Sequence, residues 1–175
     1  MDGPVAAGAG LARRPALGQY AAMKLRLIAV GKDRSGLYQP AVDEYVKRLG
    51  RYLKFELLEL PEARRHAGTP QARVEEGEAI LTKLRPGEWV VALDERGREL
   101  TSVELSRKVE GWLGAGRDVT LVIGGSDGLS PELAARAQEK LSLSRFTLAH
   151  RLARLVLVEQ LYRAMTIVRG EPYHK

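Results

Sequence analysis

The chain has 175 residues, of which 45% are hydrophobic and 29% charged, a composition typical of one soluble globular domain with a buried core. It has no cysteine, which excludes disulfides and thiolate metal sites and fits a reducing compartment, so we expect a cytoplasmic protein. The formal charge of +6 is compatible with a nucleic-acid partner without requiring one. The three histidines lie far apart, and no apolar run reaches the roughly 20 residues of a membrane span, so we expect neither a metal site nor a membrane segment.

Residues 1–22 differ in composition from the rest of the chain. They are rich in alanine, glycine and proline, and they carry Arg13 and Arg14 with almost no acidic residue. A secretory signal peptide needs a continuous apolar stretch after its charges, and this segment has none. An organelle transit peptide is an alternative, although the segment lacks serine. We interpret it as a disordered leader, or as an extension upstream of a natural start at Met23, and we expect a single domain over residues 23–175.

From Met23 onward, patterns typical of strands alternate with patterns typical of helices. We expect strands at residues 24–30, 54–60, 88–94, 118–123 and 145–148. We expect helices at residues 37–53, 70–84, 101–113 and 150–168, and one more that begins at Ser130-Pro131. Residues 61–70 read as an exposed loop and residues 95–97 as a turn. This alternation predicts an α/β protein, a parallel-sheet α/β/α sandwich with helices on both faces of the sheet.

A glycine-rich segment follows the fourth expected strand. The apolar run over residues 119–123 leads directly into Gly124-Gly125-Ser126-Asp127-Gly128. Glycine has no Cβ, so consecutive glycines let backbone N–H groups approach a ligand closely. Ligands of open α/β sheets bind at the carboxyl ends of the strands. We therefore expect the functional site at this turn.

The glycine segment also matches the pattern G-x-S-x-G of serine hydrolases, which is an alternative interpretation. That motif needs a helix to begin almost at Ser126, whereas the helix signals here begin at Ser130-Pro131. No aspartate follows Asp127, so a catalytic triad would have to recruit a glutamate. Neither the dinucleotide-binding pattern nor the P-loop pattern is present, which favours another ligand held by backbone groups.

The C-terminal segment has two unusual features. The helix expected at residues 150–168 is apolar on nearly every side, which indicates either a core helix or a subunit interface. After it, Tyr173, His174 and Lys175 together offer an aromatic stacking surface, a titratable group and a phosphate-binding cation.

Several of these segments together resemble one known family. They are residues 121–130, 141–144, 147–148 and 159–164, His150, the terminal residues 172–174, and the opening residues 23–25 and 29–31. They are similar to the small bacterial methyltransferases of the SPOUT superfamily, which methylate N3 of a pseudouridine in 23S ribosomal RNA of the large subunit. The similarity spans residues 23–175 and leaves residues 1–22 without a counterpart.

The resemblance implies a SPOUT methyltransferase fold with a trefoil knot in the C-terminal half and a homodimer whose partner tail completes each active site. It implies S-adenosylmethionine as the methyl donor and ribosomal RNA as the substrate. We expect the assembled ribosome, rather than free RNA, to be the substrate, because so small a chain has no separate RNA-binding domain. The alternative is a non-catalytic, ribosome-associated RNA-binding or assembly factor.

The resemblance also implies roles for particular residues. The donor-binding residues would be Leu93, Gly124, Gly125, Leu143, Ser144, Arg145, Phe146, Thr147 and Leu148. The catalytic residues would be His150, Tyr173 and His174, and the RNA-binding residues Arg151, Arg154 and Lys175. The chain departs from the family pattern at Ala149, where a proline is expected, and at Lys175, where the tail often ends in arginine.

Overall fold

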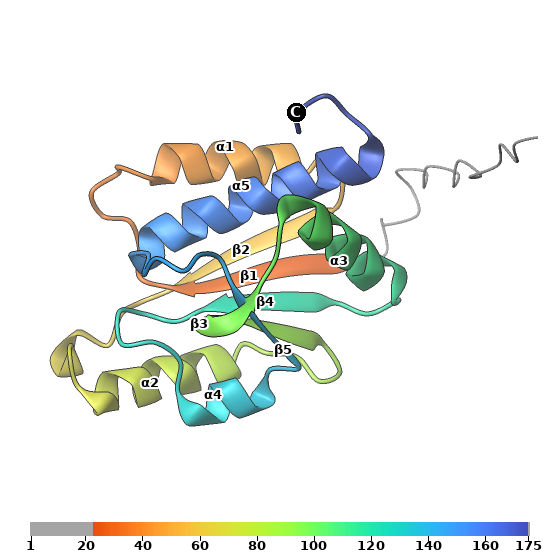
Figure 1. The fold of residues 1–175 in the computed structure, drawn as a ribbon. Helices are drawn as coiled ribbons and strands as arrows, with labels where there is room; N and C mark the ends of the chain where they lie inside the picture. Colours follow the sequence, from red (N-terminus) through yellow and green to blue (C-terminus); the bar gives the residue numbers. More distant parts are fainter. Residues whose placement is uncertain (1–22, 175) are drawn as a thin grey trace, which may run out of the picture.

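The computed structural model describes residues 23–174, so the expectations for residues 1–22 and for Lys175 lie outside the described residues. It contains a five-stranded, all-parallel sheet with the strand order β2-β1-β4-β3-β5 (Figure 1). The strands are β1 (Lys24–Val30), β2 (Lys54–Leu60), β3 (Trp89–Glu99), β4 (Val119–Ile123) and β5 (Glu139–Ser142). The predicted parallel α/β architecture is thereby confirmed.

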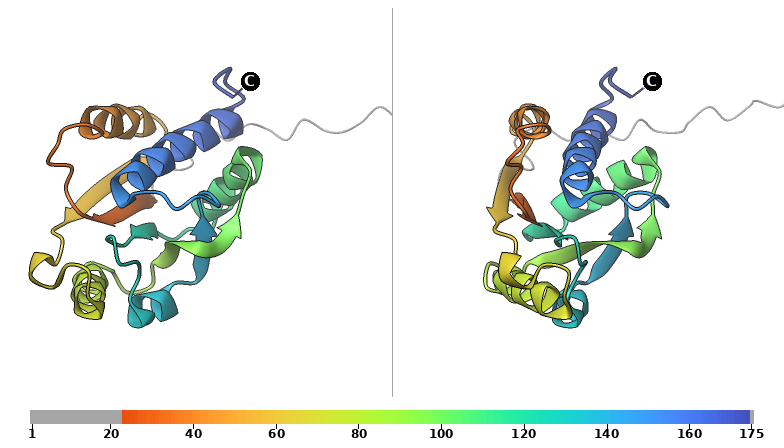
Figure 2. Two further views of the ribbon diagram at one scale, coloured as in Figure 1. Left: turned by 60° about the vertical axis from the view of Figure 1, so that its left-hand side comes forward. Right: turned by 90° about the vertical axis from the view of Figure 1, so that its left-hand side faces the viewer.

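Helices cover both faces of the sheet, as Figures 1 and 2 show from three directions. They are α1 (Gln39–Leu49), the short 3₁₀ helix η2 (Arg64–His66), α2 (Pro70–Leu81), α3 (Ser102–Gly114), α4 (Pro131–Arg136) and α5 (His150–Arg169). Helices α1, α3 and α5 pack together on one face, and α2 and α4 lie on the other. No helix within residues 23–174 is both long enough and apolar enough to cross a membrane.

Each central strand supplies side chains to two hydrophobic cores, because successive residues of a strand point to opposite faces. On β1, Leu25, Leu27 and Ala29 pack in the core beneath α1, α3 and α5. The alternate residues Ile28 and Val30 pack in the core beneath α2 and α4. A strand buried on both faces reads as a continuous apolar run, which is why β1 and β4 could be recognised from the sequence.

Polar side chains help to fix the points at which α1, α3 and α4 begin. Thr101 and Glu104 form a capping box at the start of α3, and the Ser130 hydroxyl caps α4. Ahead of α1, the Asp33 carboxylate accepts a hydrogen bond from the backbone N–H of Tyr38 at 2.6 Å. These contacts satisfy backbone donors that a helix cannot satisfy itself.

The expected strand over residues 145–148 was wrong. The fifth strand lies earlier, at Glu139–Ser142, where it pairs with β3 at the edge of the sheet. Only Leu141 and Ser142 of β5 are buried, so its sequence lacks the apolar run that marks the inner strands. Residues 145–147 are exposed and belong to a loop.

The expected turn at residues 95–97 was also wrong, because β3 continues to Glu99. A bulge between Leu93 and Arg98 lets both residues pair with Leu141 of β5. Gly97 permits this close pairing, since a Cβ atom there would lie 2.5 Å from the Leu141 carbonyl carbon. The trefoil knot that the resemblance implies stays a prediction.

Candidate active site

A cavity of about 350 Å³ opens at the carboxyl end of β4, beside the bulge of β3. Three segments form most of it: residues 94–96 within the β3 bulge, the glycine turn at residues 124–129, and residues 142–148, which lead from the end of β5 toward α5. His150 and Ala153 of α5 and Arg73 of α2 complete the wall. This volume and position are typical of a small-molecule site in a parallel α/β protein.

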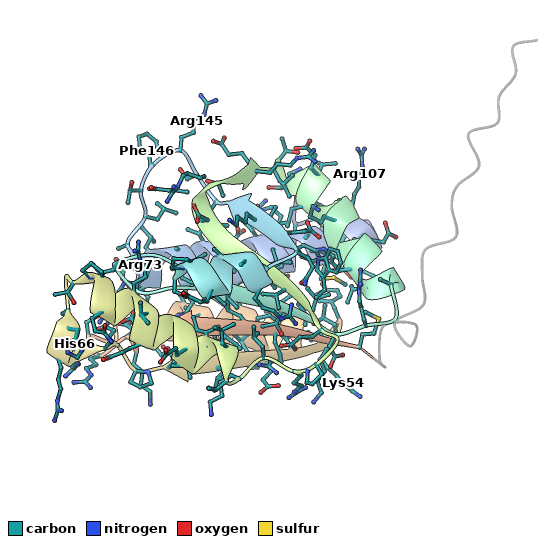
Figure 3. All side chains as sticks on the ribbon, turned by 90° about the horizontal axis from the view of Figure 1, so that it is seen from below. Lys54, His66, Arg73, Arg107, Arg145 and Phe146 are labelled. Atoms are coloured by element: carbon teal, nitrogen blue, oxygen red, sulfur yellow. The ribbon has the colours of Figure 1, made fainter. Side chains whose placement is uncertain are left out.

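All the donor-binding residues expected from the sequence line this cavity, with the exception of Arg145. The Arg145 guanidinium points outward, is 89% exposed and pairs with Glu99 at 3.3 Å. Phe146 lines the cavity although its side chain is 82% exposed. Figure 3 shows both side chains projecting from the outer edge of this loop.

The glycine turn approaches its neighbours so closely that a side chain on it would force a neighbouring group to move. A Cβ atom at Gly124 would lie 2.6 Å from the Gly128 carbonyl oxygen, and one at Gly125 would lie 2.4 Å from Glu76 Oε2. The turn is closed by a hydrogen bond of 3.2 Å from the Gly128 N–H to the Gly125 carbonyl. On this side the wall of the cavity is therefore made of backbone, at the turn where the sequence predicts the functional site.

His150 is the first residue of α5 and faces a carboxylate from the opposite side of the site. Its Nε2 lies 3.2 Å from Glu62 Oε1, and the Arg151 guanidinium donates to the same oxygen at 3.1 Å. Burial lowers the pKa of His150 below its ordinary value, and the Glu62 carboxylate opposes this shift only in part. Near pH 7 the imidazole is therefore mainly neutral and able to accept a proton.

The pair of Glu62 and His150 needs a glycine beside it. Gly31 follows β1 with a φ of +85°, and a Cβ atom there would lie 2.6 Å from both Glu62 Oε1 and His150 Nε2. Burial raises the pKa of Glu62, but the hydrogen bond from Arg151 and the charge of His150 outweigh it and lower the pKa overall. The carboxylate is thus held in its charged form next to the imidazole.

The structure places Arg154 in the interior, which corrects the expectation that it contacts RNA. Its side chain is 1% exposed, and its guanidinium donates to the Glu59 carboxylate and to the carbonyls of Val30 and Gly31. These carbonyls stand at the carboxyl end of β1, so Arg154 fastens α5 to the sheet. The Arg151 side chain is 30% exposed and stays near the cavity.

The C-terminal tail lies away from the cavity of its own chain. The Tyr173 hydroxyl donates to Glu159 at 3.0 Å, and its ring meets the Tyr162 ring edge-on at 4.8 Å between centroids. Glu159 is nine residues along α5 from His150, a separation of about 14 Å along the helix axis. The structure therefore does not bring Tyr173 to His150, and the adjacent His174 is exposed.

Sequence reasoning missed several residues of the site, above all Glu62 and Glu76. The sequence predicts an exposed loop at residues 61–70, yet Glu62 faces His150, and Glu76 lies buried behind Gly125. One signal was present for Glu62, since it follows the carboxyl end of β2, where functional residues gather in parallel sheets. Glu76 lies within α2 and carried no such signal.

Two other kinds of site find no support in the described part of the chain. Ser126 is exposed, and α4 begins only at Pro131, so the turn lacks the abrupt strand-to-helix junction of a serine hydrolase. Residues 23–174 contain no group of three or more side chains able to hold a metal ion.

Comparison with known proteins decides the family. A family model described as "Predicted SPOUT methyltransferase" matches residues 23–174. The chain belongs to the SPOUT methyltransferase family. Within this family it is 72% identical over 153 residues to the ribosomal RNA large subunit methyltransferase H of Anaeromyxobacter dehalogenans (strain 2CP-C), covering 87% of this chain and 100% of that protein.

More distant relatives carry the same name. The ribosomal RNA large subunit methyltransferase H of Limosilactobacillus reuteri (strain DSM 20016) is 45% identical over 159 residues, covering 87% of this chain and all of that protein. The protein of that name from Hahella chejuensis is 44% identical over 155 residues, covering 87% of this chain and 99% of its own length. A SPOUT methyltransferase needs a methyl donor, and the cavity beside the glycine turn offers room for one.

Proposed function

We propose that the chain is a cytoplasmic, S-adenosylmethionine-dependent methyltransferase that modifies N3 of a pseudouridine in 23S ribosomal RNA. Membership of the SPOUT methyltransferase family and the shared name of its relatives support this proposal. The observation that carries it is the cavity walled on one side by the Gly124-Gly125 turn, which opens beside a half-buried, neutral histidine. The cavity supplies a donor site, and the histidine supplies a proton acceptor next to it.

The residues of the cavity fit such a donor. Leu93, Leu143 and Leu148 give apolar surface suited to an adenine ring, while the turn at Gly124-Gly125 admits close contact with backbone. Charged residues of both signs also line the cavity. Asp94, Glu95 and Asp127 complement the positive sulfonium and ammonium groups of the molecule, and Arg73 and Arg96 complement its carboxylate. The loop at residues 143–148 provides further backbone groups.

When bound, S-adenosylmethionine supplies a methyl group activated by the positive charge on sulfur. The protein therefore has to align the nucleophile and exclude water. The N3–H group of the base must lose its proton as the N–C bond forms and the C–S bond breaks, and His150 accepts that proton in our proposal. Glu62 holds the imidazole in place and stabilises the cation that results.

The proposed enzyme is a homodimer with a trefoil knot in each chain. In one chain the tail packs near the middle of α5 and leaves the cavity without Tyr173 and His174. A partner subunit that supplies these two residues would complete the site, with Tyr173 stacking on the base. Arg151 and Lys175 would then contact the RNA backbone.

Methyl transfer to ribosomal particles tests the proposal. The purified chain, given labelled S-adenosylmethionine and large subunits that lack the modification, should methylate one pseudouridine, located by mass spectrometry of RNA fragments. We expect a faster reaction on assembled particles than on free 23S RNA, and equal rates on both would contradict that part of the proposal. Donor binding without any methylated RNA would favour the alternative, a non-catalytic assembly factor.

A matched pair of glycine variants links the activity to the cavity. Gly125→Ala places a methyl group 2.4 Å from Glu76 Oε2, so we expect the dissociation constant for the donor to rise about tenfold or more. Gly111→Ala makes the same change in α3 at a position with no atom within 4 Å of the new Cβ, and should leave binding unchanged. Equal affinities in the two variants, measured by calorimetry, would place the donor elsewhere.

A further inference from the structure

Glu76 is a buried carboxylate that stands behind the donor cavity without lining it. It belongs to α2 and is 6% exposed. Its Oε1 accepts a hydrogen bond of 3.0 Å from the backbone N–H of Ala63. Its Oε2 is buried against Gly125, and within residues 23–174 it meets no donor at good hydrogen-bond geometry, although the backbone of Gly125 lies close enough to lower the pKa of the carboxyl. Buried carboxylates are rare unless something in the protein uses them, because burial removes their hydration.

The two oxygens of Glu76 face the two halves of the site. Ala63 directly follows Glu62, whose carboxylate lies 3.2 Å from His150. Gly125 belongs to the turn that walls the donor cavity. A single carboxylate therefore contacts both the loop that orients the histidine and the turn against which the donor lies.

The next residue of α2 reinforces this arrangement. A Cβ atom at Gly77 would lie 2.2 Å from Ser130 Oγ, so α2 presses against the far end of the glycine loop as well. Glu76 and Gly77 thus support both ends of the segment between β4 and α4. This support comes from behind, on the face of the sheet opposite α5.

We propose that Glu76 is a positioning residue: its carboxylate fixes the Gly124-Gly125 turn for the methyl donor and holds the Glu62 loop in register with it. This inference rests on the proposed function, since it concerns the same cavity. Burial raises the pKa of Glu76, and the charges of Asp127 and Glu62 add to that shift, against hydrogen bonds from the backbone. The carboxylate is therefore sensitive to pH in a range where most surface glutamates stay charged.

Glu76→Gln tests the proposal with little change in shape. The amide can accept from Ala63 through one atom only, which leaves an N–H donor against Gly125 where an acceptor had been. We expect the dissociation constant for S-adenosylmethionine, measured by calorimetry on the full chain, to rise about tenfold or more. Glu78→Gln is the matched control, because Glu78 is exposed on the same helix and should bind the donor as the wild type does.

The pH dependence of binding separates positioning from general stability. In the wild type, donor affinity should fall as the pH drops through the raised pKa of Glu76, and Glu76→Gln should flatten that part of the profile. If Glu76→Gln lowers only the melting temperature and leaves both the affinity and its pH profile as in the wild type, the residue is merely structural and the proposal is overturned. Glu76→Asp is a second variant, to be used if the glutamine variant folds poorly. It keeps the negative charge, so its affinity for the donor should lie between that of Glu76→Gln and that of the wild type.

The same measurements distinguish this inference from the proposed function. A wild-type chain that fails to bind S-adenosylmethionine contradicts the proposed function itself. A wild-type chain that binds it with the same affinity as Glu76→Gln contradicts only the role of Glu76.

Discussion

The environment of His150 decides its chemistry at the scale of single residues. Burial lowers its pKa, and the Glu62 carboxylate partly restores it. In Glu62→Gln that opposition is lost while the positive charge of Arg151 stays nearby, so the pKa of His150 should fall further. If His150 acts as the base, activity is lost as pH falls through that pKa, and the acid limb of the profile of methyl transfer should therefore move to lower pH. Single-turnover rates across pH measure this shift.

Direct titration of the histidine by NMR completes that prediction. The His150 resonance should titrate at lower pH in Glu62→Gln than in the wild type, in step with the acid limb of the rate profile. Glu110→Gln removes an exposed carboxylate from α3 and should move neither quantity. An acid limb that keeps its position while the resonance shifts would show that another group accepts the proton.

At the scale of elements, Arg154 joins α5 to the carboxyl ends of β1 and β2. Arg154→Ala would leave the Glu59 carboxylate and two backbone carbonyls without their donor, and it would open a space inside the fold. We expect the free energy of unfolding to drop by about 3 kcal/mol, measured by urea denaturation at one fixed protein concentration. Arg107→Ala on the exposed face of α3, labelled in Figure 3, should lose little. Equal losses in both variants would contradict the structural role of Arg154.

The sequence predicted the strands well wherever both faces of a strand are buried. Strands β1 and β4 are buried on both faces and read as apolar runs, and the glycine turn follows β4 directly, so its place at the edge of the sheet could be foreseen. Strand β5 could not, because it lies at the edge and only two of its residues are buried. The bulge in β3 depends on contact between Gly97 and Leu141, which no local pattern encodes.

The residues that support the site could not be predicted from local sequence patterns, because their contacts join positions far apart in the chain. Glu62 contacts His150, 88 positions later, and Glu76 contacts Gly125 only because the fold brings α2 and β4 together. Arg154 shows the opposite case, in which the residue type was noticed but its position was misjudged. An arginine suits phosphate on the surface and carboxylate in the interior equally well, and only packing distinguishes the two.

At the scale of the whole molecule, the position of the tail bears on the proposed homodimer. Tyr173 packs against Tyr162 and Glu159 of its own α5, and Figure 1 shows the tail turning back toward α1. The cavity lies at the other end of α5, beside His150. Tyr52 also donates to Glu171 of the tail. The tail is thus presented on the surface formed by α1 and α5, and a partner chain placed there would receive it.

Mixed dimers test this arrangement. One chain carries His150→Ala and keeps its tail, and the other ends at Gly170 and keeps its histidine. Each variant alone should fold as the wild type does, yet should transfer no methyl group. If the tail of one chain completes the cavity of the other, refolding both variants together gives some dimers with one intact site. Random pairing then restores about a quarter of the wild-type activity, because half of the dimers are mixed and each has one complete site of two.

A site completed within one chain gives a different result, since neither variant then contains both the histidine and the tail, and mixing restores nothing. Full activity of the chain that ends at Gly170 would show that the tail takes no part in the reaction. The control is the affinity of that shortened chain for the donor. The cavity lies at the opposite end of α5, so donor binding should be unchanged, and a loss of methyl transfer then cannot be attributed to a damaged donor site. Recovery on mixing, together with inactive single variants, is therefore the outcome that only a shared active site produces.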